Sequence, residues 1–184
     1  MPVLTDPMTY EELLTYPNDG KRREIHDGEL IVAPSPDWYH QDLVTGLATD
    51  FRLWVRLNVP GGKVLASPLD VRLTPHNVYQ PDIVYISPAR LHILRETMPV
   101  EGAPDLVVEV LSPSTRTYDQ REKARVYAQS GILEYWIVDP EARTVEVLAL
   151  DGDRYVRIPQ DEGRAASRVL VGFSVGLAAL FAGL

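Results

Sequence analysis

Apolar and polar residues alternate in two rhythms along this chain, and the rhythms predict where helices and strands lie. Between residues 37 and 58, apolar positions recur every three or four residues, the spacing of one buried stripe on an amphipathic helix. A shorter helix is predicted over residues 9–16, because Thr9 followed by Glu12 forms a capping box and Pro17 ends the segment. We expect the longer helix to be the best defined in the chain.

Short runs of apolar and β-branched residues predict the strands. Residues 23–33 give two of them around Asp27-Gly28, a pair that is typical of a tight hairpin turn. Three further runs, broken by Pro68 and by a turn at residues 74–77, predict an antiparallel meander. These runs are residues 63–67, 69–73 and 82–86.

The second half of the chain alternates strands and helices in the manner of an α+β fold. Residues 105–111 are apolar on both faces apart from Glu109, so we expect a central strand that is covered on both sides. A helix from about Asp119 to Gln129 follows, with Gly131 as the expected cap. Further helices are predicted over residues 88–96 and at the C-terminus, and further strands at 134–139, 144–150, 154–158 and near 169–175.

Composition narrows the organisation and the functional classes. The 184 residues suit one domain, which we place at residues 1–184. The absence of cysteine excludes disulfides, thiol nucleophiles and cysteine-ligated zinc, so any metal must be bound by oxygen or imidazole. We expect a cytoplasmic protein without a membrane span, because no signal peptide is recognisable and no apolar stretch approaches the ~20 residues of a span.

The formal net charge of −8 bears on nucleic-acid binding. It argues against a protein that coats nucleic acid without specificity, because such binding depends on neutralising phosphates with Lys and Arg. It does not exclude a nuclease, whose clustered carboxylates are neutralised only when a metal ion binds.

A carboxylate inside the strand at residues 105–111 is the first sign of chemistry. Glu109 is costly there unless it is paired with an arginine or bound to a metal, and both explanations stay open. Asp82 opens the strand at 82–86 directly after Pro81 and would lie beside Glu109 if the two strands pair antiparallel. Facing residues on adjacent strands have Cβ atoms ~5 Å apart, near enough for both carboxylates to hold one ion.

Two other charged residues belong to this region. Asp105 lies four residues from Glu109, about 13 Å away along one strand, so it cannot share an ion with Glu109 and is expected to be a strand-start or turn residue. Lys123 is one of 3 lysines in an arginine-rich chain and shares a helix face with Tyr127, which we expect in the core. Its amine could reach Glu109 and orient a water, although a solvated helix lysine would give the same pattern.

The chain also resembles a known family. The motifs YEELLTYP, REIHDGELIVAPSP, QPDIVYIS and APDLVVEVLSPSTRTYDQREKARVYAQSGILEYWIVDP follow one another within residues 8–182. They are similar to the Uma2 family, restriction-endonuclease-like proteins of the PD-(D/E)XK nuclease superfamily. The resemblance implies a restriction-endonuclease-like fold, with a central mixed β-sheet flanked by helices. It also implies an Mg²⁺-dependent endonuclease that hydrolyses phosphodiester bonds in DNA, and a homodimer would suit the cutting of two strands.

The resemblance implies roles for individual residues. Asp82 and Glu109 match the acidic positions of the superfamily and would bind Mg²⁺ or Mn²⁺ together with the carbonyl of Val110. Leu111 stands where the standard motif has its lysine, and Lys123 on the following helix matches that displaced lysine. Lys123 would position the attacking hydroxide or stabilise charge in the transition state.

Several alternatives stay open. Glu24 matches an acidic residue that many family members place near the N-terminus, but it could equally be a strand glutamate paired with Arg22 or Arg23. His40 matches a family position and could reach a phosphate, or it could make a structural hydrogen bond at the helix start. Besides the nuclease, two functions remain. One is a nucleic-acid- or protein-binding module on the same fold that has lost turnover, and the other is a hydrolase that uses Glu24 and Glu109 as an acid–base pair, as glycosidases do.

Overall fold

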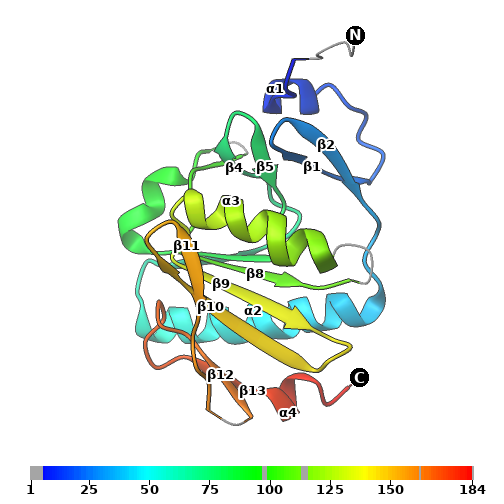
Figure 1. Cartoon of the computed structure of the whole chain (residues 1–184). Coiled ribbons are helices and arrows are strands. Elements are labelled where there is room, and N and C mark those ends of the chain that lie inside the picture. The colour runs from blue at the N-terminus through cyan, green and yellow to red at the C-terminus, as the bar shows by residue number, and fades with distance from the viewer. Residues whose placement is uncertain (1–5, 97–98, 113–115, 162, 184) are drawn as a thin grey trace.

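The computed structural model describes residues 6–96, 99–112, 116–161 and 163–183, and its strands form two large sheets and one small pair (Figure 1). The six-stranded sheet has the order β11-β10-β9-β8-β6-β3, and the five-stranded sheet has the order β2-β1-β5-β4-β7. The larger sheet contains β3 (Lys63–Ala66), β6 (Ile83–Ile86), β8 (Leu106–Val110), β9 (Glu134–Asp139), β10 (Thr144–Asp151) and β11 (Arg154–Arg157). The smaller sheet contains β1 (Arg22–His26), β2 (Glu29–Ala33), β4 (Val71–Thr74), β5 (Asn77–Tyr79) and β7 (Val100–Glu101). The separate pair is β12 (Arg164–Ala166) with β13 (Ser174–Gly176).

Helices cover the larger sheet on both faces, which confirms the α+β class and the mixed sheet flanked by helices (Figure 1). The helical elements are α1 (Tyr10–Leu13), α2 (Trp38–Asn58), the 3₁₀ turn η1 (Pro88–Ile93), the π-helical turn η2 (Tyr118–Lys123), α3 (Ala124–Gln129) and α4 (Leu177–Leu180). Successive residues of β8 show the two faces, because Leu106 and Val108 belong to the apolar cluster with α2 whereas Val107 belongs to the cluster with α3. Glu109, two residues after Val107, therefore lies on the α3 side.

Local signals mark the helix ends, and two of them were predicted, namely the capping box of α1 and the glycine after α3. Helix α1 ends at Leu13, earlier than the predicted end before Pro17. Thr9 and Glu12 form the reciprocal capping box of α1. The side chain of Asp37 caps α2 by accepting a hydrogen bond from the backbone N–H of His40 at 3.0 Å. Gly131 follows α3 with a φ of 82°, a left-handed conformation that favours glycine and ends the helix.

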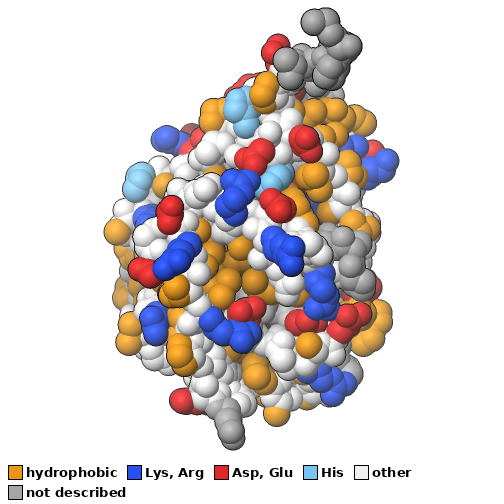
Figure 2. Space-filling model, in the orientation of Figure 1, with side chains coloured by type: hydrophobic (Ala, Val, Ile, Leu, Met, Phe, Trp, Pro, Cys, Tyr) orange, Lys and Arg blue, Asp and Glu red, His pale blue; other side chains and the backbone are white. Residues whose placement is uncertain are grey.

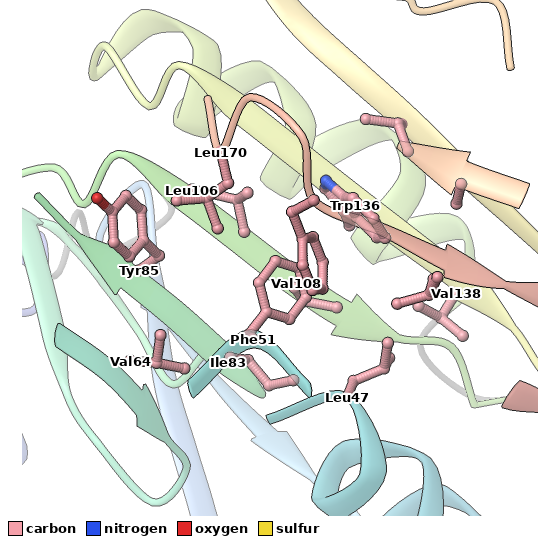
Figure 3. Close-up of a cluster of buried hydrophobic side chains, with 14 of the residues drawn as sticks. Leu47, Phe51, Val64, Ile83, Tyr85, Leu106, Val108, Trp136, Val138 and Leu170 are labelled. Carbon is pink, nitrogen blue, oxygen red and sulfur yellow. The ribbon is translucent and has the colours of Figure 1, made fainter. Parts of the chain in front are cut away.

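The buried stripe of α2 packs on the larger sheet as its periodicity predicted. Leu47 and Phe51 point toward Val108, Trp136 and Val138 (Figure 3). The rings of Phe51 and Trp136 lie edge to face with centroids 5.3 Å apart, a favourable aromatic arrangement. Strand β8 is buried along its whole length, as expected of a central strand.

The predicted meander of residues 63–67, 69–73 and 82–86 is wrong. β3 pairs with β6, and the chain between them leaves the sheet to form β4 and β5 in the other one. The predicted turn at residues 74–77 is shorter than expected, since β5 already begins at Asn77. A local apolar pattern specifies that a segment is a strand but not which strand it pairs with, because pairing depends on contacts distant in sequence.

Two further expectations need correction. The last strand was predicted near residues 169–175, but within that range only the residues of β13, from Ser174 onward, form a strand. Its partner β12 was not predicted. The helix predicted from Asp119 to Gln129 begins with the wider π-helical turn η2 before α3. In the part of the chain that the structure describes, no helix has the length and apolarity required to span a membrane.

Candidate functional site

The pairing of β6 with β8 brings Asp82 beside Glu109. The strands are antiparallel with Ile83 opposite Val108, so one further step in register places Asp82 opposite Glu109. The backbone N–H of Val110 donates to Asp82 Oδ2 at 2.8 Å. Asp82 and Glu109 are 1% and 2% exposed, so two carboxylates are held together away from bulk solvent.

Lys123 points into the protein and reaches the same place. Its Nζ atom lies 3.0 Å from Glu109 Oε1, 3.1 Å from Glu24 Oε1 and 3.2 Å from Asp119 Oδ1. The turn η2 carries both Asp119 and Lys123, and π-helical turns inside helices are frequent at functional sites. The reading of Lys123 as a solvated surface lysine is therefore wrong, since its side chain is 3% exposed.

Glu24 comes to the site from the smaller sheet. It lies on β1 and is 1% exposed, and its Oε1 atom accepts from the backbone N–H of Gln80 at 2.9 Å. The same atom is 3.2 Å from Arg22 Nη2 and 3.1 Å from Lys123 Nζ. Glu24 therefore pairs with Arg22, as one of its two interpretations expected, and it also lies in the cluster around Glu109. Its role as a metal ligand stays a prediction.

Arg22 is the central residue that sequence reasoning did not place in the site. Its two terminal nitrogens lie 3.1 Å from Asp82 Oδ1 and 3.5 Å from Glu109 Oε2. A signal was present in the sequence, because residues two apart on a strand share a face, and Arg22 precedes Glu24 by two positions. The family resemblance implied roles for carboxylates and a lysine but none for this arginine.

His40 and Val110 meet at the rim of the carboxylate pair. His40 Nε2 lies 3.1 Å from the carbonyl oxygen of Val110 and 3.3 Å from Asp82 Oδ2. His40 therefore makes the structural hydrogen bond that was one of its two expected roles. The carbonyl of Val110, the third expected metal ligand, retains a second lone pair beside that hydrogen bond.

Two more residues contact the site without having been singled out for it. Tyr127 is fully buried, as predicted for a core residue, and its hydroxyl also donates to Glu109 Oε1 at 2.7 Å. Asp119 lies four residues before Lys123 and pairs with it. Helical spacing could have suggested that ion pair, since residues four apart share a helix face.

Burial and mutual charge shift the pKa values of the cluster in different directions. Burial, reinforced by Asp82 and Asp119 against the opposing charges of Lys123 and Arg22, raises the pKa of Glu109 to about 8. Burial opposes ionisation of Asp82 as well, but His40 and Arg22 hold its pKa below the usual range. Burial alone would lower the pKa of Lys123, yet the surrounding carboxylates raise it well above normal, so Lys123 is an ammonium ion.

A cleft opens onto the cluster between the segment that follows β2 and the turn η2. Its cavity has a volume of about 200 Å³, and Val110 lines it together with the charged and polar groups of the cluster: Arg22, Glu24, His40, Asp82, Glu109, Asp119 and Lys123. In the described ranges, no three carboxylate or imidazole side chains are arranged as a preformed metal site. The donor set still suits Mg²⁺ or Mn²⁺ chemically, because carboxylate oxygens of Asp82, Glu109 and Glu24 converge on a position that already holds a cation, the guanidinium of Arg22.

Asp105, at the other end of β8, takes no part in this cluster. Its Oδ2 atom accepts from the backbone N–H of Ser87 at 2.6 Å, and its Oδ1 atom lies 3.4 Å from Arg90 Nε. Asp105 therefore fixes the start of the strand, in agreement with the spacing argument that separated it from Glu109.

Comparison with known proteins agrees with this geometry at the level of fold and family. The chain is similar to the crystal structure of a protein from Anabaena variabilis ATCC 29413 described as a putative nuclease belonging to DUF820. The two share 20% sequence identity and a TM-score of 0.79, over 96% of this chain and 98% of the other, which shows a common fold. No curated protein sequence matches the chain. The model of the Uma2 family, described as "Putative restriction endonuclease", matches residues 10–180, and the chain therefore belongs to the Uma2 family.

Proposed function

We propose that this protein is a metal-dependent nuclease that hydrolyses phosphodiester bonds in DNA. The observation that carries the proposal is the convergence of Asp82, Glu109 and Glu24 with Lys123 in the wall of one cleft. Membership of a family described as "Putative restriction endonuclease" supports the reaction class and the choice of DNA. The proposed cofactor is Mg²⁺ or Mn²⁺.

In the proposed mechanism, Asp82, Glu109 and the carbonyl of Val110 would hold the metal. A bound divalent ion polarises the phosphate and lowers the pKa of a coordinated water. Lys123 is held by Glu24 and Glu109, so its ammonium has a fixed position from which to orient the attacking water or to stabilise charge on the phosphate. Glu24 acts as a positioning residue for Lys123 and as a further ligand, directly or through water.

The acid–base pair hypothesis receives no support from the geometry. Glu24 Oε1 and Glu109 Oε1 contact the same ammonium of Lys123, at 3.1 and 3.0 Å. A glycosidase needs its two carboxyl groups on opposite sides of a sugar, at least ~5 Å apart with the substrate between them. Lys123 occupies the space between these two.

The distribution of charge shapes the expected substrate binding. On the face that carries α3, Lys and Arg side chains are interspersed with Asp and Glu (Figure 2). Together with the net charge of −8, this arrangement favours local binding at the cleft over tight binding to bulk DNA. A homodimer that presents two clefts is the proposed form for cutting both strands, and sedimentation of the purified protein would reveal it.

A cleavage panel tests the proposed function. Double-stranded, single-stranded and branched DNA, and RNA, are incubated with the protein in Mg²⁺, in Mn²⁺ and in a chelator. We expect metal-dependent cleavage of at least one DNA substrate and its loss in Asp82→Asn and Lys123→Met. Asp105→Asn is the matched control, because it makes the same chemical change at the opposite end of β8 and should leave cleavage intact.

Two outcomes would overturn the proposal. Cleavage that persists in Asp82→Asn would assign the activity to a contaminant or another site. If a preparation that unfolds cooperatively on heating, and is therefore folded, cleaves none of the substrates, the binding module without turnover would be favoured.

A further inference from the structure

Arg22 lies where the carboxylates of the site converge. Its Nη1 atom is 3.1 Å from Asp82 Oδ1, and its Nη2 atom is 3.2 Å from Glu24 Oε1 and 3.5 Å from Glu109 Oε2. Nη2 also donates to the backbone carbonyl of Gln80. One guanidinium group thus bridges carboxylates that come from both large sheets.

Asp82 and Glu109 each divide their two oxygens between different partners. Asp82 Oδ2 accepts from the backbone N–H of Val110, and Glu109 Oε1 accepts from Lys123 and Tyr127. The other oxygen of each carboxylate, Asp82 Oδ1 or Glu109 Oε2, faces Arg22. A metal ion held between the two carboxylates would need these same oxygens, so Arg22 and the ion compete for them.

The contacts of Arg22 suit a cation that can leave. It approaches each carboxylate through one contact, whereas the stronger arrangement is a fork of two parallel hydrogen bonds to a single carboxylate. Its Nε atom is buried without a hydrogen-bond partner among the described residues, which is unfavourable. Its side chain is 21% exposed toward the cleft, whereas those of Asp82 and Glu109 are 2% and 3% exposed.

We propose that Arg22 is a displaceable counter-ion, which neutralises the carboxylates in the metal-free protein and leaves them when a divalent cation binds Asp82 Oδ1 and Glu109 Oε2. This inference rests on the proposed function, since it concerns the same ion. The exchange replaces one positive charge by two, and Mg²⁺ approaches oxygen to ~2.1 Å, closer than any guanidinium nitrogen. Arg22 thereby lowers the affinity for metal, because the ion must bind the minor population from which the guanidinium has withdrawn.

Magnesium binding in the absence of nucleic acid provides the first test. Calorimetric titration with MgCl₂ is carried out on the wild type, Arg22→Met and Arg23→Met. We expect Arg22→Met to bind Mg²⁺ at least about tenfold more tightly than the wild type, within the usual range of coupling between sites. Arg23→Met is the matched control, because it removes the same charge from the adjacent residue, whose guanidinium pairs with Asp19 instead of the cluster. Its affinity should stay within about twofold of the wild type, since that pair lies outside the cleft.

Nuclear magnetic resonance of the arginine side chains separates displacement from a simple effect of charge. In the metal-free wild type, the guanidinium signals of Arg22, assigned by their loss in Arg22→Met or Arg22→Lys, should show hindered rotation. Saturating Mg²⁺ should convert them to the averaged signals of a freely rotating group. The measurement uses the wild-type protein, so it remains decisive even if Arg22→Met does not fold.

Each other outcome has a defined meaning. The inference is overturned if Mg²⁺ binds while the Arg22 signals stay hindered, or if Arg22→Met binds no more tightly than Arg23→Met. It is also overturned, together with the metal dependence, if neither the wild type nor Arg22→Met binds Mg²⁺. Displacement of Arg22 by Mg²⁺ without cleavage of any DNA would support this inference and reject the proposed nuclease.

Discussion

Glu109 and Glu134 lie on neighbouring parallel strands, β8 and β9, and both are almost fully buried, yet they are held by different kinds of partner. Glu134 accepts hydrogen bonds from neutral groups, which include the indole N–H of Trp136 at 2.7 Å and the hydroxyl of Ser167 at 2.6 Å. The backbone N–H groups of Arg168 and Val169 complete the set at 2.6 and 3.1 Å. Glu109 is held mainly by the ammonium of Lys123 and the guanidinium of Arg22.

The difference lies in what each carboxylate can exchange. The donors around Glu134 belong to the backbone, to the short side chain of Ser167 and to the fully buried indole of Trp136, so they form a fixed cradle that ties the segment before β13 to the larger sheet. The cations around Glu109 are long side chains beside a cleft, and one of them, Arg22, is the group that we propose a metal ion displaces. Burial alone therefore does not identify a functional carboxylate, because a buried charge with neutral, immobile donors is a structural link.

The largest expected effect separates the two glutamates by activity. Glu109→Gln should lower the Mg²⁺-dependent cleavage rate on the order of 10³-fold, because a metal ligand supports several kcal/mol of transition-state stabilisation. Glu134→Gln makes the same change and should leave the rate per folded molecule within about threefold, since it lies outside the cleft. Single-turnover cleavage, corrected for the folded fraction of each variant, measures both. Equal losses of cleavage rate in the two variants would contradict the distinction between a functional and a structural glutamate.

Stability should show the reverse order. Glu134→Ala leaves the donors from Trp136, Ser167 and the backbone buried and unsatisfied, so we expect the free energy of unfolding to fall by about 3 kcal/mol or more. Glu109→Gln replaces a carboxyl group whose pKa burial raises to about 8, and the amide retains an acceptor. The free energy of unfolding should therefore fall by less than in Glu134→Ala. Urea unfolding followed by tryptophan fluorescence gives both values. A Glu134→Ala variant as stable as the wild type would show that the cradle contributes little.

The sequence predicted those parts of the fold that depend on neighbouring residues. The capping box of α1 at Thr9, the hairpin at Asp27-Gly28 and the buried strand around Glu109 each follow from a pattern within a few positions. The pairing of β3 with β6 does not, because the two strands are joined through β4 and β5 of another sheet. The sequence therefore indicated the elements better than their connections.

The residues of the candidate site also differ in how far the sequence could place them. Asp82 and Glu109 could be placed together by one assumption, antiparallel pairing, which the register of β6 and β8 bears out. Helical spacing put Lys123 on the face of Tyr127 with its amine in reach of Glu109, but a solvated lysine has the same local pattern, so the sequence could not decide between the two. The position of Arg22 depends on β1 meeting the other sheet, and no local pattern encodes that approach.

A smaller effect should come from Tyr127, a neutral side chain that donates a hydrogen bond to Glu109. Tyr127→Phe removes the hydroxyl that donates to Glu109 Oε1 but keeps the ring and the contact of that oxygen with Lys123. We expect the free energy of unfolding to fall by about 1 kcal/mol, the usual contribution of one hydrogen bond. Cleavage should fall less than tenfold if Lys123 and Arg22, more than Tyr127, define the site. A loss as large as that of Glu109→Gln would make the neutral donor as important as the cations.

The smallest effect concerns Asp139, which closes β9 at the opposite end from Glu134 and combines both kinds of partner. Its Oδ1 atom accepts from the backbone N–H groups of Glu141 and Ala142, each at 3.1 Å, and its carboxylate pairs with Arg116. The hydrogen bond from Arg116 holds the pKa of Asp139 below its usual value.

Because folding lowers this pKa, the stability that Asp139 contributes through its charge is present above about pH 4, the range of an unperturbed aspartate, and is lost as the pH falls through the folded value. Asp139→Asn keeps an acceptor for the turn but removes the charge, and it should lower the free energy of unfolding at neutral pH by about 0.5–1 kcal/mol. The difference between the wild type and Asp139→Asn, followed by urea unfolding from neutral pH downward, should shrink below about pH 4. A difference that stays constant with pH would assign the contribution of Asp139 to its turn hydrogen bonds, and so place it with Glu134 as a carboxylate held by neutral donors.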